Sequence, residues 1–205
     1  MTELMSRIPR QHLIGGRWTG EPSLEVIDPA TGQVLTTVAD AGVETARSAL
    51  DAAVAAADDW AATRPRERAE LLRRAYELIV ARGDDFALLM TLEMGKPLAE
   101  ARGEVAYGAE FFRWFSEEAV RVHGRYGKAP LSGQRIVTDL TPVGPVYAIT
   151  PWNFPLAMAT RKIGPALAAG CTVVVKPASA TPLTTLLLME VLLAAGLPGG
   201  VVNTF

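Results

Sequence analysis

The 205-residue sequence has little of several features that mark common protein classes. Its one cysteine, Cys171, excludes an intramolecular disulfide and suits a reducing compartment. Its basic residues are scattered and its formal net charge is −2, which argues against a nucleic-acid partner. Residues 1–10 lack the apolar core of a signal peptide, and the most apolar stretch, 183–197, is too short to cross a bilayer. These absences predict a soluble cytoplasmic protein with no membrane partner.

Apolar residues make up 49% of the sequence, which is enough for a substantial core. Their periodicity changes along the chain and divides it into four regions. The first region carries short strands and turns, and the second has apolar residues at helical spacing. The third is a loop followed by a strand, and the fourth alternates apolar strands with helices. The four regions are residues 1–40, 41–123, 124–143 and 144–205.

The second region is predicted to hold four helices. Leu50 and Val54 fall on the apolar face of the first, Thr63 is a candidate N-cap of the second, and Gly83 is a candidate stop. The predicted helices cover residues 43–60, 64–82, 84–94 and 98–122. In the third region, residues 124–133 are predicted as a loop and 135–140 as a strand.

The fourth region has the pattern of an α/β fold. Short apolar strands alternate with helices that end at glycines, which predicts a parallel sheet covered on both faces. The predicted strands are 145–150, 172–176 and 201–205, and the predicted helices are 156–169 and 182–195.

Two loops follow the first two strands of this region, and ligands of such sheets bind beyond the carboxyl ends of the strands. The first loop offers an amide and an indole, and the second offers a cation and a hydroxyl, which together suit an anionic, ribose-bearing ligand. The loops are Thr150-Pro151-Trp152-Asn153 and Lys176-Pro177-Ala178-Ser179. The usual glycine-rich phosphate motifs are absent, so spacing alone predicts only an α/β nucleotide-binding domain.

Several linked motifs then narrow this prediction. In chain order they are EMGKP at 93–97, GPV at 144–146, PWNFP at 151–155, GPALAAGC at 164–171 and VKPA at 175–178. In this order the motifs resemble the NAD(P)-dependent aldehyde dehydrogenases, over residues 13–205, and the tract 149–162 is most similar to the succinate-semialdehyde branch. The resemblance implies the first half of a Rossmann-like parallel sheet in residues 144–205, preceded by a strand-and-helix region. It also implies a bridging or oligomerisation role for residues 124–143.

The resemblance gives roles to the first loop. Asn153 matches the amide of the family's oxyanion hole, whose N–H binds the oxygen as the aldehyde carbon becomes tetrahedral. From the residues alone, Asn153 is equally suited to cap the following helix. Ile149, Thr150, Pro151 and Trp152 match the floor of the cofactor cleft, and Trp152 as ordinary core remains an alternative.

The second loop matches the site of the adenosine ribose. Lys176, Pro177, Ala178 and Ser179 belong to it, and many NAD-preferring relatives have a glutamate where Ser179 stands. An acid there repels a 2′-phosphate, whereas a serine does not, so the cofactor is expected to be NADP or NAD, with NADP accepted. A solvated strand end is the alternative for Lys176.

The remaining reactive side chains have separate interpretations. Arg161 matches a position that helps to hold the distal carboxylate of a semialdehyde, and a helix-surface arginine is the alternative. Cys171 opens the second strand and is expected to be a buried, inert thiol. His12 and His123 lie in loop-like sequence and are expected at the surface, and no metal site is expected.

The implied reaction oxidises an aldehyde, with succinic semialdehyde favoured, to the acid. In the family, the nucleophilic cysteine and the general-base glutamate lie beyond the position of Phe205. We therefore expect the N-terminal part of an enzyme that is inactive alone, is completed by a second chain, and forms a homo-oligomer when complete. The two helices of the fourth region are then expected to expose apolar faces. A non-catalytic nucleotide-binding module and a structural or assembly fragment remain alternatives.

Overall fold

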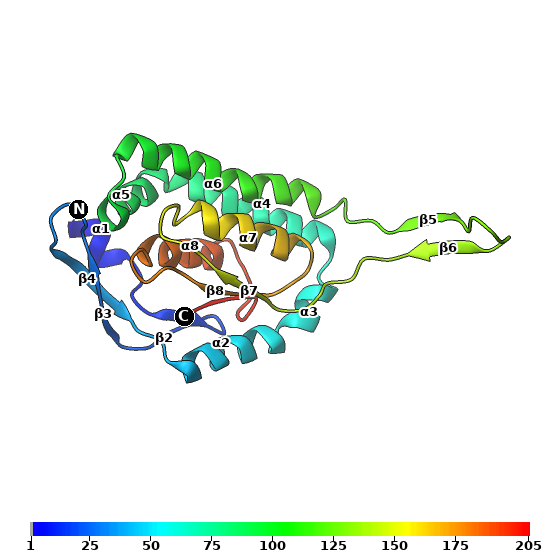
Figure 1. The fold of residues 1–205 in the computed structure, drawn as a ribbon, viewed down its shortest axis with the longest axis horizontal. Coiled ribbons are helices and arrows are strands. Elements are labelled where there is room, and N and C mark those ends of the chain that lie inside the picture. The colour runs from blue at the N-terminus through cyan, green and yellow to red at the C-terminus, as the bar shows by residue number, and fades with distance from the viewer. Residues whose placement is uncertain (1) are drawn as a thin grey trace.

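A computed structural model describes residues 2–205, and their elements stack in layers around one short parallel sheet (Figure 1). The chain begins with a short helix and two antiparallel hairpins, β1 with β2 and β3 with β4. These elements are α1 (Thr2–Arg7), β1 (His12–Ile14), β2 (Arg17–Thr19), β3 (Pro22–Ile27) and β4 (Val34–Ala39). The short strands and turns predicted for this region are confirmed.

Five helices follow, and three of them form a layer above the sheet. They are α2 (Val43–Ala55), α3 (Ala57–Ala62), α4 (Pro65–Ala81), α5 (Gly83–Met94) and α6 (Leu98–Glu118). Helix α5 ends at Gly95, whose positive φ of 87° closes the helix and turns the chain toward Lys96. This turn carries residues of the site described below.

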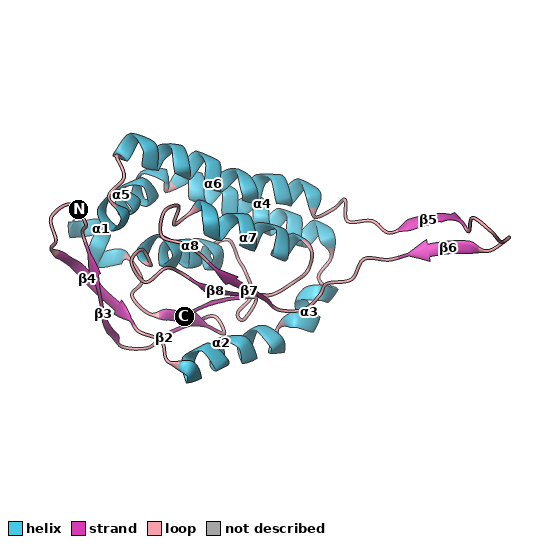
Figure 2. Ribbon diagram, viewed as in Figure 1, coloured by secondary structure: helices cyan, strands magenta, loops and turns pink. Residues whose placement is uncertain are grey.

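The predicted parallel sheet is present in the last region, which confirms the α/β fold class (Figure 2). Strands β7 (Val146–Ile149), β8 (Val173–Lys176) and β9 (Val202–Thr204) pair in the order β7-β8-β9. Helix α7 (Ala157–Ala168) joins the first two strands, and α8 (Leu183–Ala194) joins the last two. The central strand β8 is apolar and nearly fully buried, as a strand covered on both faces should be.

Helices cover the sheet on both sides. Helices α7 and α8 pack between the sheet and the layer of α4, α5 and α6, while α2 packs against β8 and β9 from the other side. Helix α8 is therefore surrounded, which explains why it is apolar on every face. The expectation that α7 and α8 expose apolar faces is wrong.

The first hairpin meets the last described strand at the sheet. Strand β1 contacts β9, and the backbone N–H of Gly15 donates to Asn203 Oδ1 at 2.9 Å. The turns approach so closely that a Cβ atom on Gly16 would lie 2.8 Å from the Cα atom of Gly199. Only glycine pairs permit this contact.

Several local predictions are corrected. The first predicted helix is two helices that meet at Ala56, and Leu50 and Val54 are exposed on the outer face of α2, because only its alanine face packs on the sheet. Arg64, not Thr63, is the N-cap of α4, and Gly83 begins α5 rather than ending a helix.

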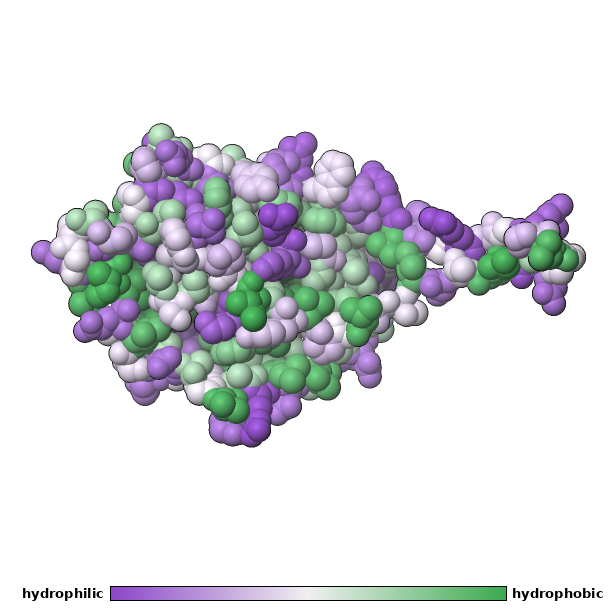
Figure 3. Space-filling model, in the orientation of Figure 1, coloured by the Kyte–Doolittle hydropathy of each residue, from purple (hydrophilic) through white to green (hydrophobic). Residues whose placement is uncertain are grey.

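On the visible face of the molecule, apolar residues gather over α2 and along the hairpin arm (Figure 3).

Residues 124–143 form a long arm that leaves the body of the molecule (Figure 1). Its strands β5 (Arg125–Lys128) and β6 (Arg135–Thr138) pair antiparallel, and every residue in them is exposed. The strand over 135–138 was predicted, but β5 falls where a loop was expected. Gly127 interrupts the β-forming pattern of β5, and pairing with β6 determines its conformation.

Candidate functional site

The two predicted loops leave the sheet at the same edge. Strands β7 and β8 are parallel neighbours in which Ile149 lies opposite Lys176. The N–H of Thr150 donates to the carbonyl of Lys176 at 3.1 Å, so the strands stay paired until the loops begin. Both loops therefore start from the carboxyl edge of the sheet, where ligands of open parallel sheets bind.

The first loop, residues 150–156, turns its indole outward and its amide partly inward. Trp152 is 57% exposed, so ordinary core is the wrong interpretation for it, whereas Thr150 is buried. Asn153 is partly buried, and its Oδ1 accepts no hydrogen bond from the described residues. Its side chain does not cap α7, whose N-cap is Leu156. The amide is therefore free for another role.

A buried ion pair from the helical layer holds this loop. Glu104 on α6 and Lys96 after α5 form a salt bridge, and both are nearly fully buried. Glu104 Oε1 accepts from the N–H of Leu156 at 2.9 Å and of Ala157 at 3.1 Å. Lys96 Nζ donates to the carbonyl of Asn153 at 3.1 Å. The first N–H groups of α7 thus obtain a negatively charged partner, which also complements the helix dipole.

A second buried acid holds the start of α8 in the same way. Glu93, in the last turn of α5, accepts from the N–H groups of Leu183 at 2.7 Å and of Thr184 at 2.8 Å, and from the Thr184 hydroxyl. Complete burial raises the pKa of Glu93 to about 7, and the nearby charge of Glu104 adds to the rise. These hydrogen bonds lower the pKa but do not offset the burial.

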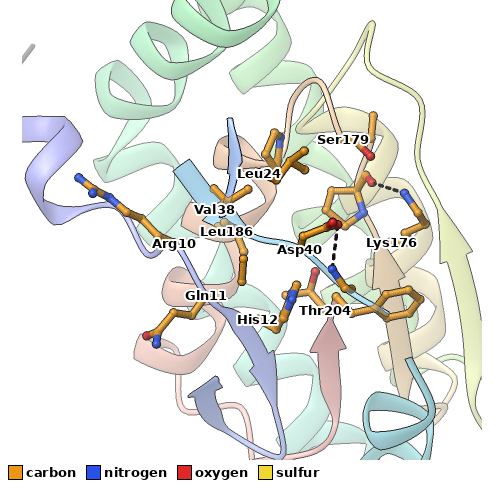
Figure 4. Close-up of a pocket in the computed structure, with 16 residues that line it drawn as sticks. Arg10, Gln11, His12, Leu24, Val38, Asp40, Lys176, Ser179, Leu186 and Thr204 are labelled. Carbon is orange, nitrogen blue, oxygen red and sulfur yellow. Dashed lines mark hydrogen bonds between the residues drawn. The ribbon is translucent and has the colours of Figure 1, made fainter. Parts of the chain in front are cut away.

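The second loop lines a small pocket of about 100 Å³ (Figure 4). Lys176, Pro177, Ala178 and Ser179 all contribute to its wall, together with Arg10, His12 and Asp40 from the N-terminal region. Ser179 is exposed, and Lys176 is half-buried with its Nζ donating to the carbonyl of Pro177 at 3.2 Å. Lys176 is therefore not simply a solvated strand end. Residues 149–153 do not line this pocket.

Arg161 belongs to helix α7 and to neither loop. It is exposed on α7, its guanidinium carbon lies 5.8 Å from the ring centre of Phe111, and its Nη1 lies 3.9 Å from the sulfur of Met158. The next residue, Lys162, donates to the carbonyl of Ile149. The side chain of Lys162 thus ties α7 to the end of β7, while Arg161 faces away from the sheet.

His12 is misplaced by the sequence analysis and Cys171 is not. His12 lies in β1 and is only 5% exposed, because the β1–β2 hairpin packs against β9 and this contact buries the imidazole. Burial lowers the pKa of His12, against the opposing effect of the Asp40 carbonyl. His123 is exposed, as expected. Cys171 is buried at the start of β8, also as expected.

The quoted motif at 93–97 includes Glu93 and Lys96, but the sequence analysis gave no role to these two residues or to Glu104, which hold the starts of α7 and α8. Glu93 follows Phe86, Leu89 and Met90 at helical spacing, and all four side chains lie on the buried face of α5. An acid on an apolar helix face was the signal, because a buried carboxylate requires hydrogen-bond donors. Glu104 lies on the buried face of α6 in the same manner.

Within residues 2–205, no group of three or more His, Cys, Asp or Glu side chains is arranged to hold a metal ion. None of the described helices combines the length and the apolar character that a bilayer crossing requires.

Comparison with known proteins agrees with this geometry. The profile of the aldehyde dehydrogenase family matches residues 18–205. Succinate-semialdehyde dehydrogenase of Paenarthrobacter nicotinovorans is 64% identical over 170 residues, 83% of this chain and 38% of that protein. Succinate-semialdehyde dehydrogenase (NADP+) of Escherichia coli K12 is 48% identical over 197 residues, 95% of this chain and 41% of that protein.

A solved structure gives the same result at the level of the fold. The crystal structure of succinate-semialdehyde dehydrogenase from Burkholderia pseudomallei superposes with a TM-score of 0.92 and 49% identity, over 98% of this chain and 42% of that one. The chain thus spans about two fifths of the length of these relatives. Because the family profile covers residues 18–205 and the fold agrees, the chain belongs to the aldehyde dehydrogenase family.

Proposed function

We propose that this chain forms the N-terminal part of an aldehyde dehydrogenase that oxidises succinic semialdehyde to the acid with NADP or NAD. The observation that supports the proposal most is the free amide of Asn153 at the carboxyl edge of β7, beside the pocket-lining loop that follows β8. The relatives named succinate-semialdehyde dehydrogenase support the choice of aldehyde.

Asn153 serves in this proposal as the oxyanion donor. Its side-chain N–H binds the aldehyde oxygen as negative charge develops there. A neutral donor aimed at such an oxygen contributes about 3–4 kcal/mol to transition-state stabilisation. The surroundings of the amide support this role. Its Oδ1 accepts no hydrogen bond from the described residues, and the side chain does not cap α7, so neither contact competes with substrate.

The second loop holds the cofactor in this proposal. The Lys176 ammonium and the Ser179 hydroxyl line the pocket with no carboxylate in their own loop, and this donor set fits a phosphorylated ribose. Asp40 shares the pocket wall, where Arg10 and Lys176 supply two cations against its one carboxylate. When bound, the nicotinamide supplies the hydride acceptor. Ile149, Thr150, Pro151 and Trp152 are proposed to form the floor beneath it.

Arg161 is proposed to help hold the distal carboxylate of the substrate. Its exposed guanidinium is unpaired with any acid of the described chain, which leaves its bidentate donors available. In the alternative, Arg161 is an ordinary surface residue of α7. Arg161→Met would separate the two, since only the first predicts a raised KM for succinic semialdehyde and an unchanged KM for an uncharged aldehyde.

The isolated chain is proposed to be inactive, because its one thiol is not placed for attack. Cys171 is buried at the amino end of β8, opposite the edge from which the Asn153 loop leaves. The nucleophile and the general base must then come from another segment or a second chain.

Joining the chain after Phe205 to the following part of the Paenarthrobacter relative tests this proposal. We expect the hybrid to reduce NADP with succinic semialdehyde, while the 205-residue chain does not, as followed by cofactor absorbance. A folded hybrid that oxidises no aldehyde would contradict the proposal, and so would turnover by the isolated chain.

A non-catalytic nucleotide-binding module is the second candidate, because the pocket of Lys176 and Ser179 is formed entirely by this chain. Titration calorimetry of the isolated chain with NADP tests it. Heat of binding together with an inactive hybrid would favour this module over the enzyme.

The arm of residues 124–143 is proposed to join copies of the complete protein into a homo-oligomer. Its strands are exposed throughout, and Leu131 at the tip is fully exposed at 100%. An edge strand of this kind is a template for pairing with another chain. Removing residues 125–138 should leave the complete protein monomeric in light scattering.

A further inference from the structure

Two charged side chains outside the reacting groups pair with each other and direct their other described polar contacts to one short segment. Lys96 is 7% exposed and Glu104 is 3% exposed, although charged residues are rarely buried so deeply. Removing such charges from water is unfavourable, and an ion pair alone often fails to offset it. Their hydrogen bonds to other residues therefore indicate what the pair does.

Every one of those other contacts falls within residues 153–157. Glu104 Oε1 accepts from the N–H groups of Leu156 at 2.9 Å and Ala157 at 3.1 Å. Lys96 Nζ donates to the Asn153 carbonyl at 3.1 Å and lies 4.3 Å from the ring centre of Phe154. The segment is thus held at its first backbone carbonyl, at its aromatic ring and at the start of α7.

The Asn153 side chain depends on this backbone attachment. Its Oδ1 makes no hydrogen bond within residues 2–205, so no contact of the side-chain oxygen fixes the direction of the amide. The position of the amide then depends on the backbone from which the side chain projects and on the packing that buries it. A preorganised donor must stay aimed at the developing charge, because a shift of about 1 Å lowers the rate strongly.

We propose that Lys96 and Glu104 are positioning residues for the Asn153 amide. Lys96 fixes the Asn153 carbonyl, Glu104 fixes the first turn of α7, and their ion pair keeps both charges in place. The functional consequence rests on the proposed oxyanion role of Asn153, but the structural part does not.

The structural part is tested on the 205-residue chain itself by amide hydrogen exchange of the Lys96→Met variant. We expect exchange at Leu156 and Ala157 to quicken about tenfold or more, because the charged acceptor loses its counterion. Leu183 and Thr184, held by Glu93, are the internal control and should change by less than about twofold. Equal acceleration at all four amides would show general loosening and overturn the inference.

The functional part is tested in the hybrid enzyme. Lys96→Met should lower kcat for succinic semialdehyde roughly tenfold or more with little change in KM, because an interaction made only in the transition state weakens. Lys96→Arg retains the charge and the donors and should restore part of kcat. The matched control, Arg82→Met, removes the Arg82–Glu190 pair between the helical layer and α8 and should leave kcat unchanged.

A double variant guards against misfolding. Lys96→Met with Glu104→Gln removes both charges and leaves an amide oxygen to accept from Leu156 and Ala157. We expect exchange at these amides to return to within about threefold of the parent, while kcat stays low because the Asn153 carbonyl remains unheld. Full recovery of kcat in this variant would overturn the role of Lys96. An inactive parent hybrid with the expected exchange pattern would contradict the proposed function and leave the structural part of this inference standing.

Discussion

The two loops at the carboxyl edge of the sheet have the same construction and different electrostatics. Each loop leads into a helix whose first N–H groups donate to a buried glutamate of the helical layer. Glu104 of α6 holds the start of α7, and Glu93 of α5 holds the start of α8. Glu104 has Lys96 as its counterion, whereas within the described chain Glu93 has only N–H and hydroxyl donors.

The two attachments differ in whether a buried cation lies beside the glutamate. The Glu104 carboxylate is balanced by a cation, and the loop that it holds carries Asn153. Burial raises the pKa of Glu93 to about 7, so its charge changes within the physiological range. The loop that carries the proposed oxyanion donor is thus attached by the ion pair.

Replacing each of the two glutamates with alanine should give the largest difference, and it is a difference in the free energy of unfolding. Glu104→Ala leaves Lys96 buried without its counterion and should lower the free energy of unfolding by about 3–5 kcal/mol. Glu93→Ala leaves no buried cation and should cost about 1–3 kcal/mol. Urea denaturation of the two variants measures both losses, and equal losses would contradict the distinction between the loops.

The chemical roles of the loops should also differ. In the hybrid enzyme, Asn153→Ala should slow acylation by about 100- to 1,000-fold, because one oxyanion donor is lost. The Kd for NADP should stay close to that of the parent. Single-turnover kinetics and cofactor titration measure the two quantities, and equal damage to both would reject the oxyanion assignment.

The pH dependence of stability isolates Glu93. Because its pKa is raised in the folded chain, the folded state binds its proton more tightly than the unfolded state, and the stability that this gives is present below pH 4.5 and lost as pH rises to about 7. Relative to Glu93→Gln, the parent should lose about 3 kcal/mol across this window. Denaturation of both proteins from pH 4 to pH 8 measures it, and parallel curves would mean that Glu93 does not titrate there.

The smallest expected effect is on cofactor choice. Ser179→Glu adds a carboxylate to the pocket wall, which repels a 2′-phosphate and accepts from a free 2′-hydroxyl. The ratio of kcat/KM for NADP to that for NAD should fall about tenfold. Ser179→Gln is the control of similar size without the charge. An unchanged ratio in the glutamate variant would count against the ribose assignment.

The sequence predicts the sheet well because its signals there are local. Apolar strands bounded by glycine-stopped helices require a covered parallel sheet, and β7, β8 and β9 follow that pattern. The prediction that both loops share one edge follows from the same topology. Their residue roles came from the resemblance and stay predictions.

The incorrect and missing predictions concern residues whose surroundings come from segments far away in the sequence. Leu50 fits an apolar stripe, but alanines alone fit the narrow space between α2 and the sheet. His12 was expected in a loop, but β9, far away in the sequence, covers it. Glu93 and Glu104 lie on apolar helix faces, but the groups that each acid holds become known only when the start of a remote helix is brought against it.

The packing of the β1–β2 hairpin against β9 also constrains how the chain folds during synthesis. The hydrogen bond from Gly15 to Asn203 joins residues 188 positions apart. On a ribosome, the first hairpin must therefore wait until residue 203 has been made before its native neighbour exists. Closing so long a loop is slow, and until it closes the buried imidazole of His12 remains in water.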